Sequence, residues 1–353
     1  MQKAALIYNV PICVIYIVGL RFVYCFKHES LSFSLRKKFI KTEQRRYLKL
    51  ITFATSRNIL KRSGVKSCFF YCLGKIFPNI YSLLKKLNPN FLLKTKLSDF
   101  DLTMYVDPLD VGIGKDLFLY GRREDGATRE FVKYLRPGQI VLDIGANIGY
   151  YVLIEAMKVG STGKIYAIEP DPKNVQILVK NVEANNFSDI VDVTQGAISN
   201  HSGVAQLYVA SRSNLHTLKK MPLMEEYVAF KDVIEVPCYT LDHFLKTKSV
   251  SPSDVDIMRM DVEGYEPYIF FSSADLFEKM HDFLLFIEIH PKLIRQNDEV
   301  SFEDFILLLK NLKFKILSAY LSLSSREDSK INIASIDELL DYDDAIELFL
   351  YKE

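Results

Sequence analysis

The stretch "VLDIGANIGYY", residues 141–151, places an acid, two glycines and an asparagine between two apolar runs. The run "QIVLDI" is continuously apolar, like a buried parallel strand, and "YYVLIEAMKVG" after it has the apolar spacing of a helix. Glycine and asparagine tolerate left-handed backbone, so Gly145, Asn147 and Gly149 predict a tight loop that presents bare amides and a helix N-terminus to a ligand. An ordinary strand-to-helix turn is the alternative.

The acid of this loop indicates the kind of ligand. The dinucleotide-binding fingerprint reads G-x-G-x-x-G and holds a diphosphate, whereas this chain reads D-x-G-x-N-x-G, with Asp143 at the end of the expected strand. Because like charges repel in a poorly solvated crevice, Asp143 favours a ligand that carries an ammonium or a sulfonium group.

The charge of the chain is divided unequally along its length. Residues 1–100 contain 19 Lys+Arg and 3 Asp+Glu, although the 353-residue chain has a net charge of only +1. Residues 4–20 are uncharged and a basic flank follows them, so residues 1–28 are predicted to anchor the chain in a membrane, with the bulk of the protein in the cytoplasm.

Residues 29–98 mix basic and apolar residues, as do helices that lie on an anionic membrane surface. Helices packed on the catalytic domain would explain the same pattern. No nucleic-acid-binding module accompanies the charge, and nucleic acid is not an expected partner. No metal site is expected either, because the five cysteines form no C-x-x-C pair and no suitable spacing of His, Asp and Glu completes a ligand set.

Residues 99–353 alternate strands and helices, which predicts an α/β domain with a parallel sheet covered on both faces. The expected strands are "QIVLDI", "GKIYAIEP", "IVDVTQGAIS", "DVDIMRMD", "FLLFIEIHP" and "KFKILSAYL", with "INIASI" at an edge. Residues 203–240 interrupt the alternation with a predicted hairpin, which contains His216 as a candidate substrate contact.

Acidic side chains follow several of these strands. Glu169 ends the second strand, 24 residues after Gly145, a spacing at which a carboxylate can accept hydrogen bonds from both ribose hydroxyls. Gly196 and Ala197 leave room for a flat base. Asp261, Glu263, Glu288 and His290 lie at the ends of the fourth and fifth strands, and all these groups are expected to converge on the crevice where the strand order reverses.

The sequence resembles the FkbM family of S-adenosylmethionine-dependent methyltransferases in its motifs and their order. The matching stretches between residue 99 and about residue 320 are "VDPLDVGIGKDLFLYG", "RPGQIVLDIGANIGYY", "IYAIEPDPKN", "GAIS", "SNLHTL", "VPCYTLDHFL", "IMRMDVEGYE" and "IEIHP". The combination of "DIGANIG" with "DVEGYE" is the most specific part. The resemblance implies a Rossmann-like class I methyltransferase fold, a mostly parallel seven-stranded sheet with helices on both faces.

The resemblance also implies roles for the cofactor-binding residues. The loop Gly145 to Gly149 would face the methionine part of S-adenosylmethionine, Glu169 would hold the ribose, and the neighbourhood of Gly196 and Ala197 would hold the adenine. Members of the family mostly methylate hydroxyl groups, commonly on sugars or secondary metabolites. A lipid-linked glycan is therefore among the expected acceptors if the chain is anchored in a membrane.

A hydroxyl acceptor has to lose its proton, and a carboxylate or imidazole within hydrogen-bond reach can take it. Asp261 is the first candidate base, followed by Glu263 and His290, although Asp261 serves equally well as a purely positional residue. Two other functions fit parts of the pattern. A NAD-dependent oxidoreductase would share the sheet and Glu169, and a catalytically silent membrane-associated scaffold would share the fold.

Overall fold

The computed structural model describes residues 59–61, 67, 69, 71, 79–110, 112–322 and 328–353. The chain divides into two compact units, Met1–Leu93 and Lys94–Glu353. In the first unit, helix α4 (Ile80–Leu87) carries Lys85 and Lys86 in its last turn. Among the helices described, none combines the length and the apolar character needed to cross a bilayer. The anchor predicted for residues 1–28 and most of the extension predicted for residues 29–98 lie outside the described residues.

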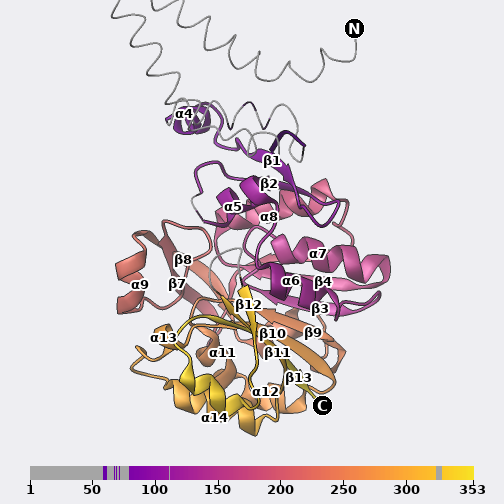
Figure 1. The fold of residues 1–353 in the computed structure, drawn as a ribbon, viewed down its shortest axis with the longest axis vertical. Coiled ribbons are helices and arrows are strands. Elements are labelled where there is room, and N and C mark those ends of the chain that lie inside the picture. The colour runs from indigo at the N-terminus through magenta and orange to yellow at the C-terminus, as the bar shows by residue number, and fades with distance from the viewer. Residues whose placement is uncertain are drawn as a thin grey trace, which may run out of the picture. The chain divides into compact units, whose positions relative to one another are not determined.

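The second unit is built on an eight-stranded sheet with the order β12-β11-β13-β10-β9-β3-β4-β5 (Figure 1). The strands from β10 to β5 run parallel, and β13, β11 and β12 are antiparallel to their neighbours. Their bounds are β3 (Ile140–Ile144), β4 (Lys164–Glu169), β5 (Val191–Gln195), β9 (Ile257–Met260), β10 (Phe283–Ile289), β11 (Lys315–Ser322), β12 (Asp328–Ile331) and β13 (Ile346–Lys352).

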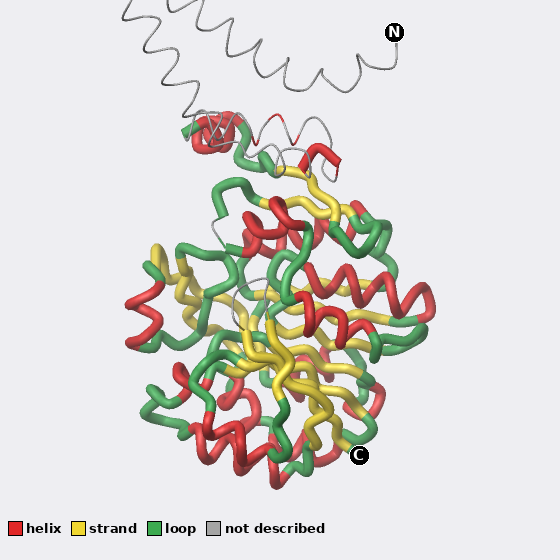
Figure 2. The backbone as a smooth tube through the Cα atoms, in the orientation of Figure 1, coloured by secondary structure: helices red, strands yellow, loops and turns green. Residues whose placement is uncertain are grey.

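Helices flank this sheet, as the alternation of red and yellow segments in Figure 2 shows. They are α5 (Ile113–Tyr120), α6 (Asp125–Val132), α7 (Tyr150–Val159), α8 (Pro172–Ala184), α10 (Leu241–Thr247), α11 (Glu266–Ser272), α12 (Ala274–Lys279), α13 (Pro291–Ile294) and α14 (Phe302–Asn311), with 3₁₀ turns at Gly160–Thr162, Pro252–Asp254 and Ile336–Asp341. Mostly parallel strands with flanking helices confirm the predicted Rossmann-like class I methyltransferase fold, with β12 as an additional edge strand among those described.

Local sequence explains where the helices next to the ligand crevice begin. At the start of α8, the Asp171 carboxylate accepts a hydrogen bond of 2.7 Å from the Lys173 amide, and Pro172 occupies the first helical position, where no amide hydrogen is needed. Helix α7 starts directly after Gly149 and ends at Val159, before Gly160, which adopts a positive φ of 65°.

The predicted strand "IVDVTQGAIS" was wrong as a single element. Gly196 separates β5 from β6 (Ala197–Ile198), which leaves the main sheet and pairs with β8 (Phe230–Tyr239). Strands β8 and β7 (Gly203–Ala210) form the expected hairpin, which encloses α9 (Pro222–Tyr227). Strand β13 was not predicted, and of "INIASI" only Ile331 belongs to β12. A further pair, β1 (Leu93–Lys96) and β2 (Thr103–Val106), forms a separate two-stranded sheet.

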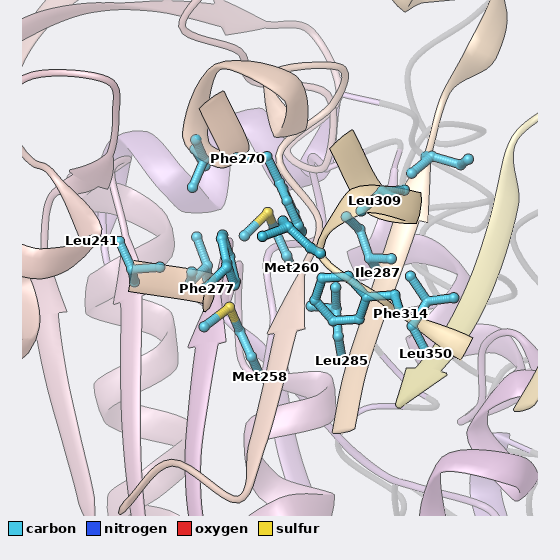
Figure 3. Close-up of a cluster of buried hydrophobic side chains, with 14 of the residues drawn as sticks. Leu241, Met258, Met260, Phe270, Phe277, Leu285, Ile287, Leu309, Phe314 and Leu350 are labelled. Atoms are coloured by element: carbon cyan, nitrogen blue, oxygen red, sulfur yellow. The ribbon is translucent and has the colours of Figure 1, made fainter. Parts of the chain in front are cut away.

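A large apolar cluster lies on one face of the sheet, because side chains alternate between the two faces along each strand. Met258 and Met260 of β9 join Leu285 and Ile287 of β10 in a buried cluster with residues of α10, α11, α12 and α14 (Figure 3). Each fully buried side chain of this size contributes about 1.5–3 kcal/mol to the stability of the fold, relative to the same side chain exposed to water. Arg259, between the two methionines, therefore points to the opposite face, toward α7, where its guanidinium lies 4.2 Å from the Tyr151 ring centroid.

Candidate functional site

A cavity opens where the strand order reverses, at the carboxyl ends of β3, β4 and β9. Seven residues that the sequence assigned to the site line it: Gly145, Asn147, Glu169, Gly196, Ala197, Asp261 and Glu263. Asp143, Gly149 and His290 do not. Further walls come from Arg123, from Tyr150 and Tyr151 of α7, and from residues 213, 214 and 216–218 of the segment between β7 and β8.

The loop after β3 adopts the left-handed conformations that its sequence predicts. Gly145, Asn147 and Gly149 have φ values of 84°, 50° and 90°. A Cβ atom on Gly145 would lie 2.0 Å from the backbone oxygen of Asp261. Glycine is therefore required at position 145 because the chain after β9 passes so close, and not only because a ligand approaches. At Gly149, a Cβ would lie 2.5 Å from Leu178 of α8, so this glycine serves packing.

Glu169 is almost fully buried and is held by three protein donors. Its Oε2 accepts from the Asn147 amide at 2.9 Å, and its Oε1 accepts from the Asp171 amide at 2.9 Å and from Asn174 Nδ2 at 3.3 Å. Burial raises the pKa of Glu169 from 4.5 to about 7, although these amides favour the ionised form. The carboxylate is thus fixed at the cavity wall with lone pairs left for hydroxyl donors.

Gly196 continues this wall, since its amide donates to the Glu169 backbone oxygen at 3.0 Å. A Cβ on Gly196 would lie 2.9 Å from Tyr239 Cε2, so the space beside its backbone is already taken on that side. Gly196 and Ala197 line the cavity as predicted.

The expectation that Asp143 meets the ligand directly was wrong. Strand β3 continues to Ile144, and the Asp143 side chain points to the α7 face, where it is fully buried. Arg259 Nη1 donates to Asp143 Oδ1 at 3.1 Å, and Arg259 Nη2 donates to Asp261 Oδ2 at 2.9 Å. Asp143 therefore acts on the cavity only through Arg259, whose other fork nitrogen fixes Asp261.

Glu263 also lines the cavity, but its surroundings differ from those of Glu169. It adopts a left-handed φ of 54°, and His290 Nε2 lies 3.4 Å from its Oε2 and 3.7 Å from Glu288 Oε1. Burial raises the pKa of Glu263 well above its ordinary value, and the neighbouring carboxyls of Asp261 and Glu288 raise it further. His290 and Glu288 lie behind Glu263 and do not line the cavity, in contrast to the prediction for His290.

Glu266 organises the backbone of the segment "DVEGYE". Its Oε1 accepts from the amides of Val262 at 3.1 Å and Gly264 at 3.3 Å, and its side chain is fully buried. Burial raises the pKa of Glu266 from 4.5 to about 7. This carboxyl shapes the turn that presents Glu263 and does not line the cavity.

Side-chain hydrogen bonds hold the segment between β7 and β8 against the loop Gly145 to Gly149 that follows β3. Asn147 Nδ2 and Asn174 Nδ2 donate to the Ser213 backbone oxygen at 3.0 and 3.2 Å, and Ser213 Oγ donates to Asp110 at 2.8 Å. His216 lines the cavity, but its Nε2 pairs with Asp171 at 2.8 Å and its Nδ1 accepts from the Ala210 amide. Both ring nitrogens are therefore engaged in holding the segment.

The sequence reasoning missed Arg123, Tyr150, Tyr151 and Ser213. The two tyrosines read as the start of an apolar helix, Arg123 belongs to no motif, and Ser213 opens the matching stretch "SNLHTL" but was assigned no role. Only the tertiary fold brings these side chains to the cavity.

Comparison with known proteins identifies the domain. Residues 143–316 match the family model described as the methyltransferase FkbM domain. The chain is 35% identical over 101 residues to 31-O-demethyl-FK506 methyltransferase FkbM of Streptomyces tacrolimicus, covering 28% of this chain and 36% of that protein. It is 37% identical over 71 residues to protein-L-isoaspartate O-methyltransferase 1 of Arabidopsis thaliana, covering 20% of this chain and 30% of that protein.

These matches span only about a third of the length of either relative. Among solved structures, P. horikoshii TYW2 in complex with MeSAdo has a TM-score of 0.40 and 12% identity, covering 78% of this chain and 83% of that chain, a score too low to support a functional argument. The family match and the observed sheet agree with the motifs, and the domain belongs to the FkbM family of S-adenosylmethionine-dependent methyltransferases.

Proposed function

We propose that this protein transfers the methyl group of S-adenosylmethionine to a hydroxyl group on a sugar, a glycolipid or a secondary metabolite. The observation that carries this proposal is the single cavity that combines Glu169 with the carboxyls of Asp261 and Glu263, joined by the open loop at Gly145. Cofactor and acceptor can meet in such a cavity.

The residues of the cavity fit the cofactor. Glu169 retains acceptor capacity for the ribose hydroxyls, Gly196 and Ala197 flank the adenine position, and Gly145 and Asn147 border the methionine part. S-adenosylmethionine supplies, when bound, a methyl group on a sulfonium that an acceptor oxygen can attack in line. The main contribution of the protein is then to hold the acceptor oxygen in that line.

The geometry favours Glu263 over Asp261 as the general base. Asp261 is paired with the buried Arg259 at 2.9 Å, and protonating it would leave that guanidinium with one carboxylate fewer. Glu263 forms no ion pair with an Arg or Lys side chain among the described residues, and the nearby ring nitrogen is His290 Nε2 at 3.4 Å. Its raised pKa makes proton uptake favourable. Glu263 Oε2 would take the hydroxyl proton, and His290 Nε2 lies within ion-pair distance to share it.

Oxygen as the acceptor atom is supported by the names of the relatives. One is named as an O-methyltransferase of protein L-isoaspartate and the other as a methyltransferase of 31-O-demethyl-FK506. A proton-accepting group such as Glu263 is needed for an alcohol, whose proton is not lost unaided at neutral pH.

The proposal is tested with the full-length protein and S-adenosylmethionine that carries a deuterated methyl group. We expect mass spectrometry to find the labelled methyl on oxygen in one member of a panel of glycans, glycolipids and polyketides, with S-adenosylhomocysteine as the second product. Binding of NAD in preference to S-adenosylmethionine would instead favour the oxidoreductase, and binding of neither would favour the silent scaffold.

We also propose that the N-terminus holds the enzyme at a membrane, so that the acceptor is presented there, for example as a lipid-linked glycan, with the catalytic domain in the cytoplasm. The support is the basic excess in residues 1–100, since each Lys or Arg near an anionic surface contributes about 1 kcal/mol. Fractionation tests this proposal: an anchored protein stays with the membranes in both high salt and alkaline carbonate. Recovery in the soluble fraction at low salt would remove it.

A further inference from the structure

The turn between α5 and α6 holds an arginine at the cavity wall in a strained but well-supported conformation. Helix α5 ends at Tyr120, and Gly121, Arg123 and Glu124 lie in the turn before α6 begins. Glu124 has a φ of 41°, and a left-handed conformation costs such a residue about 1–2 kcal/mol. Surrounding contacts must offset this cost, and they do so by binding the turn to α7.

The first two residues of α7 fasten the turn. Tyr150 Oη accepts from the Arg123 amide and donates to the Arg123 carbonyl oxygen, both at 3.2 Å. Tyr151 Oη donates to Glu124 Oε2 at 2.6 Å. Because α7 begins directly after Gly149, these bonds place Arg123 beside the end of the loop that carries Gly145 and Asn147.

The guanidinium of Arg123 is only partly used by the protein. Arg123 is 9% exposed, and the Nε and Nη2 of its guanidinium both donate to Glu124 Oε1. Among the described residues, Nη1 has no hydrogen-bond partner, while the side chain lines the cavity. Arg259, the other guanidinium of the cavity, uses both Nη atoms on Asp143 and Asp261. Arg123 is thus the guanidinium with a terminal nitrogen left for a ligand.

The start of α7 adds donors at the same place. Its N-cap residue, Gly149, offers no side-chain cap, and its first turn contains no acidic residue. The first-turn amides of an uncapped helix favour an anion, and a nearby guanidinium strengthens the binding of a carboxylate. A free anion would be repelled by Asp261 and Glu263, whereas a carboxylate attached to cationic groups would be tolerated.

The geometry points to Arg123 Nη1, together with the first-turn amides of α7, as the binding site for the carboxylate of the methionine part of S-adenosylmethionine. This inference rests on the proposed function. It concerns a residue outside the segment 143–316 that matches the family model.

The test compares S-adenosylmethionine with decarboxylated S-adenosylmethionine, which keeps the sulfonium and the ammonium, by calorimetry on the full-length protein. We expect the wild type to bind the decarboxylated compound about 10- to 100-fold more weakly, since a charge-assisted hydrogen bond is lost. Arg123→Gln should lower the affinity for S-adenosylmethionine to that of the decarboxylated compound, and should leave the affinity for the decarboxylated compound unchanged. Arg122→Gln is the matched control, because Arg122 is about half exposed and pairs with Asp125.

Arg123→Gln alone leaves Glu124 buried without its partner, which can unfold the protein. The double variant Arg123→Gln/Glu124→Gln removes both charges and is expected to give the same ligand pattern. If the wild type binds S-adenosylmethionine but does not discriminate, or if the variants weaken both ligands equally or neither, this inference is wrong and the proposed function stands. A wild type that binds neither ligand overturns both.

Discussion

Two buried glutamates line the same cavity and differ in what surrounds them. Glu169 receives hydrogen bonds from two backbone amides and from Asn174, so its carboxylate is held in one place. Glu263 is surrounded by the carboxyls of Asp261, Glu266 and Glu288, which raise its pKa beyond the effect of burial. Both side chains are acids at the end of a strand, yet the first is arranged to bind and the second to exchange a proton.

Glu263→Gln is the strongest test of this difference. The amide keeps the size of the side chain but cannot accept a proton, so we expect kcat to fall by about 10²- to 10⁴-fold. Affinity for S-adenosylmethionine should change little, and single-turnover rates beside calorimetric binding constants measure both effects.

Asp261→Asn is the companion variant for the same experiment. We expect Asp261→Asn to lower kcat less than Glu263→Gln does, because Asp261 pairs with Arg259 and so has a positioning role. A larger loss of turnover in Asp261→Asn would restore Asp261 as the base and remove the distinction between the two glutamates.

The cavity wall that carries Glu169 and the wall that carries Glu263 meet at Gly145. The Gly145 amide donates to the Ile168 backbone oxygen at 3.0 Å, and the Asp261 backbone oxygen lies against the other side of Gly145. Gly145→Ala adds a Cβ against that carbonyl at a positive φ, so we expect a loss of stability of about 2–4 kcal/mol. Gly160→Ala is the control. Its φ is also positive, but nothing lies within 4 Å of the added atom. Equal melting temperatures for the two variants would show that the walls are not joined this closely.

Glu169→Ala addresses the binding wall alone. Loss of the ribose contacts should lower the affinity for S-adenosylmethionine about 10- to 100-fold while the domain stays folded. The exposed Glu183→Ala on α8 is a matched control for removal of a carboxylate. An unchanged dissociation constant in Glu169→Ala, measured by titration calorimetry, would take Glu169 out of the site.

The sequence predicts one of these glutamates better than the other. Glu169 follows from the strand, the loop and the spacing between them, all of which are local. The choice between Asp261 and Glu263 depends on Arg259, which the pleat of β9 turns toward α7, and on His290, which follows β10. Asp143 was placed at the ligand because strand ends converge, but the same pleat buries it one residue before β3 ends.

Tertiary contacts also explain why Arg123 and Ser213 escaped prediction. Arg123 lies in no periodic segment or motif, and Ser213 opens the stretch "SNLHTL", which carries no periodicity that places its side chain. Each residue reaches the cavity through partners far away in the sequence. Arg123 is 27 residues from Tyr150, and Ser213 is 103 residues from Asp110. Sequence patterns specify strands, helices and tight loops, whereas the packing of loops over a sheet edge depends on such long-range hydrogen bonds.

Glu266 provides the smallest and most controlled test, because it lies in the segment of Glu263 but has backbone donors like Glu169. A carboxyl whose pKa is raised to about 7 in the folded protein contributes stability below its unfolded value of 4.5, and loses it as the pH rises through 7. Between pH 6 and pH 8, this loss is about 1 kcal/mol. Glu266→Gln cannot ionise, so urea unfolding without ligand should show a correspondingly flatter pH dependence than in the wild type. Parallel pH profiles for the two proteins would mean that Glu266 already ionises freely, and its assignment as a fixed acceptor for the turn of Glu263 would fail.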